Sequence, residues 1–179
     1  MPEKSTHPAR SRKASGSKAE MPADISPMLA TLVKQPLEEE GWLYEVKWDG
    51  YRCLAYVNHG TVDLRSRNNK SFNEKFYPVY EAFKDLDQVV LDGEIVVLND
   101  KGMADFSALQ NWRSEADGAL VYYAFDILYL NGENLMEKPF TERRKSLERV
   151  IPATGTIRVS KAFEVHGSEF FALADKMKL

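Results

Sequence analysis

The amino-acid sequence predicts an α+β fold in which helices pack outside an antiparallel-rich, twisted sheet. From Trp42 onward, short apolar runs alternate with turn residues, which is typical of a sheet-rich domain with interspersed helices. The chain has 179 residues, of which 44% are hydrophobic and 28% charged, so it is long enough for one domain with a core. Its apolar runs, such as residues 119–125, fall far short of the roughly 20 residues of a membrane-spanning helix, so no membrane partner is expected.

The first strands surround a short polar segment. Residues 42–46 and 52–58 are predicted strands on either side of Lys47-Trp48-Asp49-Gly50. Asn58-His59-Gly60 is the expected turn into a third strand at residues 61–66. We expect these three strands to form a tight antiparallel meander.

The rest of the chain alternates helices with strands. Residues 73–83 have helical spacing, although Pro78 indicates a break or a late start. The remaining predicted elements are a strand at 89–98, a short helix at 104–112, an apolar strand at 119–130 that ends at the Asn131-Gly132 turn, a helix at 141–150 capped by Thr141, and a closing helix at 168–178.

Residues 1–21 are expected to form a flexible basic tail or linker. The first twenty residues carry five Lys or Arg against two acids, a net +3 in a chain of net −3, and almost no large apolar side chain. Such a tail is a solvated tether that could also hold nucleic acid weakly. The start has no apolar stretch of the secretory type, and the lone Cys53 allows no internal disulfide, so a cytoplasmic location is expected.

Lys47 is the candidate nucleophile. A lysine amine attacks phosphorus or a carbonyl only when neutral, so it needs burial or nearby cations, including a bound metal, to lower its pKa. Gly50 would let a phosphate approach the backbone closely. By itself, however, Lys-X-Asp-Gly also describes an ordinary exposed hairpin turn, so the surrounding sequence has to decide.

Several other kinds of site find no support in the sequence. There is no P-loop and no Gly-X-Gly-X-X-Gly, and the three histidines lack the spacing of a zinc site. Cys53 lies in an alternating strand and is expected to fill the core. The aromatic residues Trp42, Tyr44, Trp48 and Tyr51 could stack on bases or build a core.

Four further blocks accompany the lysine segment in order. They are Pro27-Met28-Leu29-Ala30, Ser66-Arg67-Asn68, Leu91-Asp92-Gly93-Glu94 and the aromatic run at residues 122–128. With them the chain resembles the covalent nucleotidyltransferases, and most closely the ATP-dependent DNA ligases of the bacterial ligase D type. The resemblance covers residues 22–179 and implies part of an ATP-grasp-like adenylation domain.

The resemblance implies a nucleotide site for ATP. Lys47 would attack the α-phosphorus and form a lysyl-adenylate. Glu45 would lie beside the adenine, and Phe125 would stack on it. Arg52 and Arg67 would contact ribose or phosphate, including the 5′-phosphate of a nick.

The resemblance also implies a metal and a DNA substrate. Glu94 would hold the ribose hydroxyls or help to place Mg²⁺ (or Mn²⁺), with Asp92 in a metal-linked role. The substrate would be nicked or broken double-stranded DNA, with other end-joining repair proteins as candidate partners, in the cytoplasm at the bacterial nucleoid.

The family pattern continues beyond Leu179 with two more motifs and an OB-fold domain. We therefore expect a partial adenylation domain that by itself is weakly active or inactive. The alternatives are a non-catalytic nucleotide- or DNA-binding module, and an RNA ligase or capping guanylyltransferase.

Overall fold

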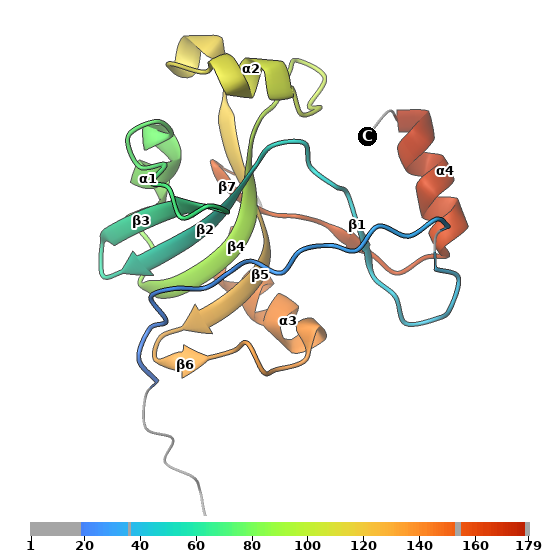
Figure 1. Cartoon of the computed structure of the whole chain (residues 1–179), viewed down its shortest axis with the longest axis horizontal. Helices are drawn as coiled ribbons and strands as arrows, with labels where there is room; N and C mark the ends of the chain where they lie inside the picture. Colours follow the sequence, from blue (N-terminus) through green and yellow to red (C-terminus); the bar gives the residue numbers. More distant parts are fainter. Residues whose placement is uncertain (1–18, 36, 153–154, 178–179) are drawn as a thin grey trace, which may run out of the picture.

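The computed structural model describes residues 19–35, 37–152 and 155–177. Its centre is a twisted six-stranded sheet with the order β3-β2-β4-β5-β6, in which β7 lies parallel beside β5 and the other pairs are antiparallel (Figure 1). The predicted α+β, antiparallel-rich fold is confirmed. The strands of this sheet are β2 (Tyr51–Asn58), β3 (Thr61–Ser66), β4 (Gln88–Val97), β5 (Leu120–Leu130), β6 (Glu133–Asn134) and β7 (Ile157–Val159).

The predicted three-stranded meander is wrong in its first strand. Only β1 (Tyr44–Glu45) forms there, and it pairs with β8 (Ala162–Phe163) rather than with β2. A strand has two edges, and β3 occupies one edge of β2. The apolar β4 occupies the other along the whole of β2, from Tyr51 opposite Ile95 to Asn58 opposite Gln88, so no edge remains for residues 42–46.

The helices lie close to their predicted positions. They are α1 (Tyr77–Phe83), α2 (Phe106–Asn111), α3 (Phe140–Val150) and α4 (Gly167–Met177), with a 3₁₀ turn at Glu115–Asp117. Pro78 stands in the first turn of α1, which confirms the late start. The predicted Thr141 cap is wrong, because α3 begins at Phe140 with Pro139 as N-cap, and this puts Thr141 inside the first turn. Residue 178, the predicted end of α4, lies outside the described residues.

The two faces of the sheet are covered differently. One face holds the main core, to which α1, α2 and α3 contribute, and Cys53 is fully buried there as expected. On the opposite face a small cluster of Leu54, Tyr56, Val90, Leu128 and Tyr129 is covered by Ala19, Met21 and Ile25 instead of a helix. Ala19 and Met21, which the sequence assigns to the tail, therefore contact the sheet.

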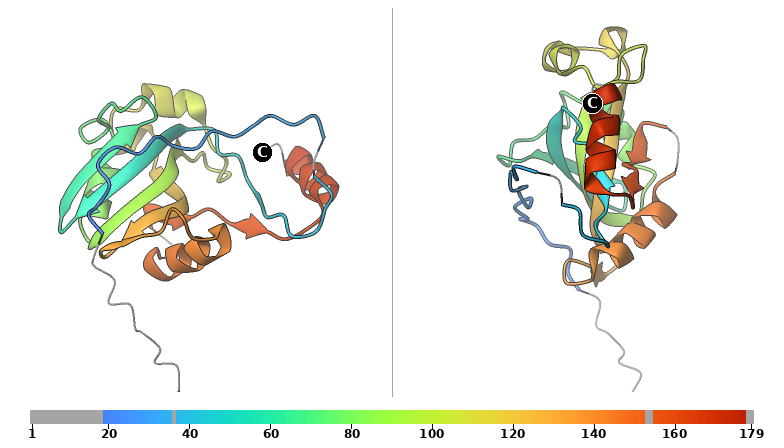
Figure 2. Two further views of the ribbon diagram at one scale, coloured as in Figure 1. Left: turned by 60° about the horizontal axis from the view of Figure 1, so that its bottom comes forward. Right: turned by 90° about the vertical axis from the view of Figure 1, so that its right-hand side faces the viewer.

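Helix α4 stands apart from the large sheet (Figures 1 and 2). It rests on the β1–β8 pair through Phe170, whose ring centroid lies 5.7 Å from Tyr44 and 5.3 Å from Phe163. Within the described part of the chain, no helix has the length and apolar character needed to cross a bilayer.

Candidate active site

The face of the sheet away from the main core carries the candidate site. Side chains alternate between faces along a strand, so Arg52 of β2 shares this face with the acidic side chains of β4. In the ladder, Arg52 is opposite Glu94, and Glu94 is opposite Tyr123 of β5. Three neighbouring strands therefore bring together side chains that are about 30 to 70 positions apart in the chain.

Two irregularities in β5 shape this face. Gly93 is opposite Ala124 while Asp92 is opposite Asp126, so Phe125 has no partner in β4. A second shift follows between Leu91 and Val90. Bulges of this kind redirect side chains next to active sites, and here the bulge delivers Phe125 to the polar face.

Lys47 lies in the loop between β1 and β2, with its side chain exposed. The next residue anchors the loop, because the Trp48 ring stacks on Tyr123 with centroids 3.8 Å apart and planes 5° from parallel. The Trp48 indole N–H also donates to Ser160 Oγ at 3.1 Å. Lys47, Glu45 and Asp49 line a hollow of about 600 Å³ that α4 closes on its far side.

Gly50 holds this loop against the sheet. A Cβ at Gly50 would lie 2.2 Å from the carbonyl oxygen of Ile95 and 2.8 Å from a methyl of Val96. The glycine therefore permits close approach to the backbone of β4, and its close approach to a phosphate stays a prediction.

The surroundings of Glu94 shift the pKa of its carboxyl group. Burial raises the pKa of Glu94 to about 7, and the positive charges of Arg52 and Lys47 oppose this shift while Asp92 adds to it. Glu94 therefore titrates near neutral pH, within the electrostatic reach of Lys47.

Arg52 and Asp92 form a two-pronged ion pair. Arg52 Nε donates to one carboxylate oxygen of Asp92 at 2.6 Å and Nη2 to the other at 2.7 Å. Burial raises the pKa of Asp92, and the guanidinium opposes that rise. The guanidinium carbon also lies 4.5 Å from the centroid of the Phe125 ring, so Arg52 covers part of that aromatic surface.

A second ion pair holds Glu45. Arg144 of α3 donates to Glu45 at 2.6 Å and also binds the carbonyl of Ser160. Burial raises the pKa of Glu45 despite the attraction of Arg144. A hollow of about 480 Å³, which we call the Phe125 hollow, is lined by Glu45, Arg52, Asp92 and Phe125. Residues 25–30 form one of its walls.

The structure thus gathers most of the predicted residues. Glu45 lines both hollows and connects the lysine loop with the Phe125 hollow, and Glu94 lies within the electrostatic field of Lys47 and Arg52. Arg67 stands apart, because its exposed side chain lines a separate hollow of about 320 Å³ beside Arg65.

Sequence reasoning missed the arginines that brace the acids. Arg143 holds Asp126 through two hydrogen bonds of 2.8 and 2.7 Å, and the adjacent Arg144 holds Glu45. An acid inside the apolar run at 122–128, followed by an Arg-Arg pair on the next helix, is the signal that could have indicated them.

Asp92 and Glu94, the two predicted metal ligands, differ in the contacts that their carboxylates already make. Both carboxylate oxygens of Asp92 accept hydrogen bonds from Arg52, whereas the Glu94 side chain has no hydrogen bond or ion pair with another described residue. No group of three or more His, Cys, Asp or Glu side chains converges among the residues in the described ranges. Mg²⁺ is commonly held by one or two carboxylates together with substrate phosphates, and Glu94 fits that pattern.

Comparison with known proteins shows related sequences. The LigD multifunctional non-homologous end joining protein of Pseudomonas aeruginosa is 42% identical over 147 residues, which is 80% of this chain and 17% of that protein. The LigD protein of Mycobacterium tuberculosis strain H37Rv is 38% identical over 156 residues, 86% of this chain and 20% of that protein. The prophage-derived DNA ligase-like protein LigB of Bacillus subtilis is 31% identical over 157 residues, 87% of this chain and 58% of that protein. The chain therefore spans a fifth or less of these LigD proteins.

Solved structures and a family model agree. A mycobacterial DNA ligase D complexed with ATP and MES is 36% identical with a TM-score of 0.74, over 84% of this chain and 50% of that chain. The ligase domain of M. tuberculosis LigD gives a TM-score of 0.65 at 37% identity, over 75% of this chain and 44% of that one. The fold is thus the nucleotidyltransferase fold of these ligase domains. A family model described as "ATP dependent DNA ligase domain" matches residues 27–176, and the chain belongs to this family.

Proposed function

We propose that this chain carries the nucleotide-binding part of an ATP-dependent DNA ligase that joins 3′-hydroxyl and 5′-phosphate ends through a lysyl-AMP intermediate. The observation that carries the proposal is the Arg52–Phe125 pair at a hollow of about 480 Å³, together with Glu45, which lines both this hollow and the one that Lys47 lines. Glu94 lies within the electrostatic reach of both Arg52 and Lys47. The LigD relatives are non-homologous end joining proteins by name, which favours a role in end joining of broken double-stranded DNA, with other end-joining proteins as partners. Such a role belongs in the bacterial cytoplasm, at the nucleoid.

In this proposal the hollow receives ATP. The adenine lies against Phe125 with Glu45 at the pocket wall, and Arg52 turns toward ribose or phosphate. The neutral amine of Lys47 attacks the α-phosphorus, a P–N bond forms, and the bond to the bridging oxygen breaks. Pyrophosphate leaves, and the lysine nitrogen gives up one proton to solvent. Arg67, which lines a different hollow, is assigned to the 5′-phosphate of the DNA end.

Glu94 is the residue that would hold Mg²⁺ or Mn²⁺, or the ribose hydroxyls. A bound divalent cation would neutralise charge on the phosphates. Asp92 could join it through the lone pairs that remain free, because each of its oxygens accepts a single hydrogen bond from Arg52.

The test is covalent capture of AMP. The purified chain is incubated at high concentration with Mg²⁺ and ATP labelled at the α-phosphate, and the labelled peptide is located by mass spectrometry. We expect a slow, substoichiometric adduct on Lys47 that Lys47→Ala abolishes without changing the melting temperature. ATP labelled at the γ-phosphate should leave no label, and GTP labelled at the α-phosphate should leave none either.

Lys34→Ala is the matched control, because Lys34 lines the same hollow as Lys47. It should keep the adduct. An adduct that persists in Lys47→Ala, or that maps to Lys34, would mean that the nucleophile has been wrongly assigned.

A further inference from the structure

Residues 19–30, which we call the strap, run across the polar face of the sheet without forming a helix or strand (Figures 1 and 2). The strap starts at the β5–β6 turn, where the Ala19 N–H donates to the carbonyl of Gly132 at 2.7 Å. The Tyr129 hydroxyl donates to the carbonyl of Ala19 at 3.0 Å. Since no strand ladder fixes the strap, side chains of the sheet determine where it lies.

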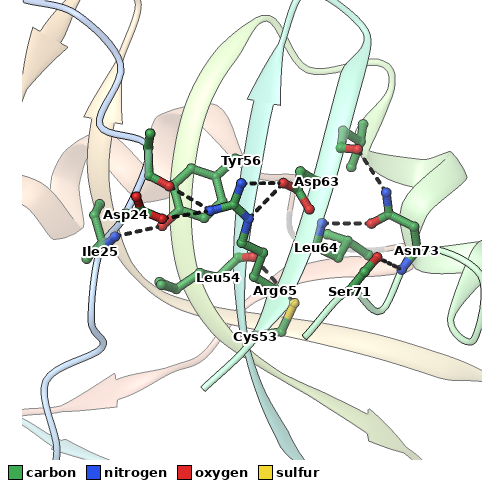
Figure 3. Close-up of polar contacts among 12 residues, drawn as sticks. Asp24, Ile25, Cys53, Leu54, Tyr56, Asp63, Leu64, Arg65, Ser71 and Asn73 are labelled. Atoms are coloured by element: carbon green, nitrogen blue, oxygen red, sulfur yellow. Dashed lines mark hydrogen bonds and ion pairs between the residues drawn. The ribbon is translucent and has the colours of Figure 1, made fainter. Parts of the chain in front are cut away.

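Arg65 of β3 holds the middle of the strap. Its Nη1 donates to the carbonyl of Ala23 at 2.7 Å and contacts the Asp24 carboxylate at 3.3 Å (Figure 3). Asp63 orients the guanidinium, because its Oδ2 accepts a hydrogen bond from Nε at 2.7 Å and lies 2.7 Å from Nη2 in an ion pair. The guanidinium also lies 5.0 Å from the centroid of the Tyr56 ring.

Tyr56 provides the second attachment. Its hydroxyl accepts a hydrogen bond from the N–H of Ile25 at 3.1 Å, and its ring is buried against Ile25 and Leu54 (Figure 3). Two side chains from neighbouring strands thus fix three consecutive strap residues, 23, 24 and 25.

The strap then becomes a wall of the Phe125 hollow. Residues 25–30 line it, and Arg52 Nη2 donates to the carbonyl of Met28 at 3.3 Å. Ile25, which Tyr56 holds, is only three positions before Met28, which contacts Arg52. A shift of the strap at Ala23–Ile25 would therefore move both the wall and a hydrogen-bond partner of Arg52.

We propose that Arg65, together with Tyr56, is a positioning residue for the nucleotide site and acts through the strap. Arg65 does not line the Phe125 hollow. Its hydrogen bond to Ala23 sets the distance between the strap and the sheet. That distance determines the shape of the hollow and, through Met28, the orientation of Arg52. This inference rests on the proposed function, because it takes the hollow to be the ATP site.

The test compares ligand affinity with strap protection and with stability. Calorimetric titration of the 179-residue chain with the non-transferable analogue α,β-methylene-ATP gives the dissociation constant. Hydrogen exchange of the backbone amides of residues 20, 21, 23–26 and 28 reports on the strap, and thermal melting reports on the fold. Arg65→Ala should weaken binding on the order of tenfold, the effect of losing charge-assisted hydrogen bonds that position the site, and should speed exchange at residues 23–26. Arg65→Lys should recover little, since an ammonium cannot reach Asp63 and Ala23 with a planar fork.

Two tyrosine variants provide the matched comparison. Tyr56→Phe removes one hydrogen bond to the strap next to the hollow, and Tyr129→Phe removes one at the far end. The first should weaken binding about threefold, the loss of part of a neutral hydrogen bond, whereas the second should speed exchange near Ala19 with an unchanged dissociation constant.

The inference is overturned if Arg65→Ala leaves strap exchange unchanged, or if it frees the strap while the analogue binds as to the original chain. It is also overturned if Tyr129→Phe and Arg65→Ala weaken binding equally in proportion to lost melting temperature, which would indicate general destabilisation. Failure of the unmodified chain to bind the analogue would instead refute the nucleotide site itself, and the inference with it.

Discussion

Glu94 connects the stability of the protein to pH. Its pKa is about 7 in the folded protein because of burial, against an ordinary value of 4.5. As the pH rises through this window, the unfolded chain loses the proton first, so the folded state loses stability between about pH 4.5 and 7 and does not recover it above.

We therefore expect Glu94→Gln, which cannot ionise, to stabilise the protein at pH 8 by about 1 to 3 kcal/mol and to change it little at pH 4.5. Chemical unfolding at the two pH values measures this difference. Glu137→Gln, at an exposed turn position outside the helices and strands, is the control for the general effect of exchanging Glu for Gln. An equal effect of Glu94→Gln at both pH values would contradict the assigned titration.

The sequence nominates several candidate site residues, but not their partners. The Lys-X-Asp-Gly turn singles out Lys47, and the resemblance to the DNA ligases implies roles for Arg52, Glu94 and Phe125, which stay predictions. The pairing of Arg52 with Asp92 depends on the register between strands 40 positions apart, which local patterns do not fix. Local patterns do not reveal the role of Arg65 either, because its hydrogen-bond partners in the strap are more than 40 positions away.

Among the elements, the loop from β1 to β2 depends on Gly50. A Cβ there would meet the carbonyl oxygen of Ile95 at 2.2 Å, and a backbone atom cannot rotate away as a flexible side chain can. We expect Gly50→Ala to lift the loop from β4, lowering stability by about 1 to 3 kcal/mol and weakening binding of α,β-methylene-ATP. Melting and calorimetric titration test both effects.

Gly60→Ala is the control that distinguishes an effect of the β1–β2 loop on the site from general destabilisation. Gly60 has a φ of +82°, so alanine is strained there, but nothing lies within 4 Å of the added methyl. It should lower stability and leave analogue affinity unchanged. If Gly50→Ala behaves in the same way as Gly60→Ala, contact of the loop with β4 does not shape the site.

The ranges of the longer strands were predictable, whereas the pairing of β1 and the irregularities of β5 were not. The structure matches the predicted ranges of β2, β3, β4 and β5 within a residue or two. An apolar run bounded by turn residues indicates a buried strand from local sequence alone. The two-residue β1 is held by β8 from more than 100 positions away, and the bulge at Phe125 reflects sheet geometry. Neither leaves a pattern in the local sequence.

For the whole molecule, we expect no detectable sealing of a nicked DNA duplex by residues 1–179 alone. The chain covers 50% of the ATP-complexed ligase D structure that it matches, and loss of even one preorganised electrostatic contributor typically costs on the order of 100-fold to 1000-fold in rate. The assay follows joining of a 5′-phosphorylated nick with ATP and Mg²⁺, with the ligase domain of M. tuberculosis LigD as the positive control. Efficient sealing would show that the described sheet and its site are sufficient.

A phosphate that attracted Arg52 would leave Asp92 as a solitary carboxylate inside the protein. Burial already raises the pKa of Asp92, so the carboxylate would take up a proton or a cation as the guanidinium departs. Capture of an anion would then be accompanied by proton uptake from the buffer, and the measured heat of binding would vary with the ionisation enthalpy of that buffer. The Arg52–Asp92 ion pair would be replaced by an ion pair of Arg52 with the phosphate and a neutral, protonated Asp92. The net charge of the interior would therefore stay balanced as the ligand arrives and leaves.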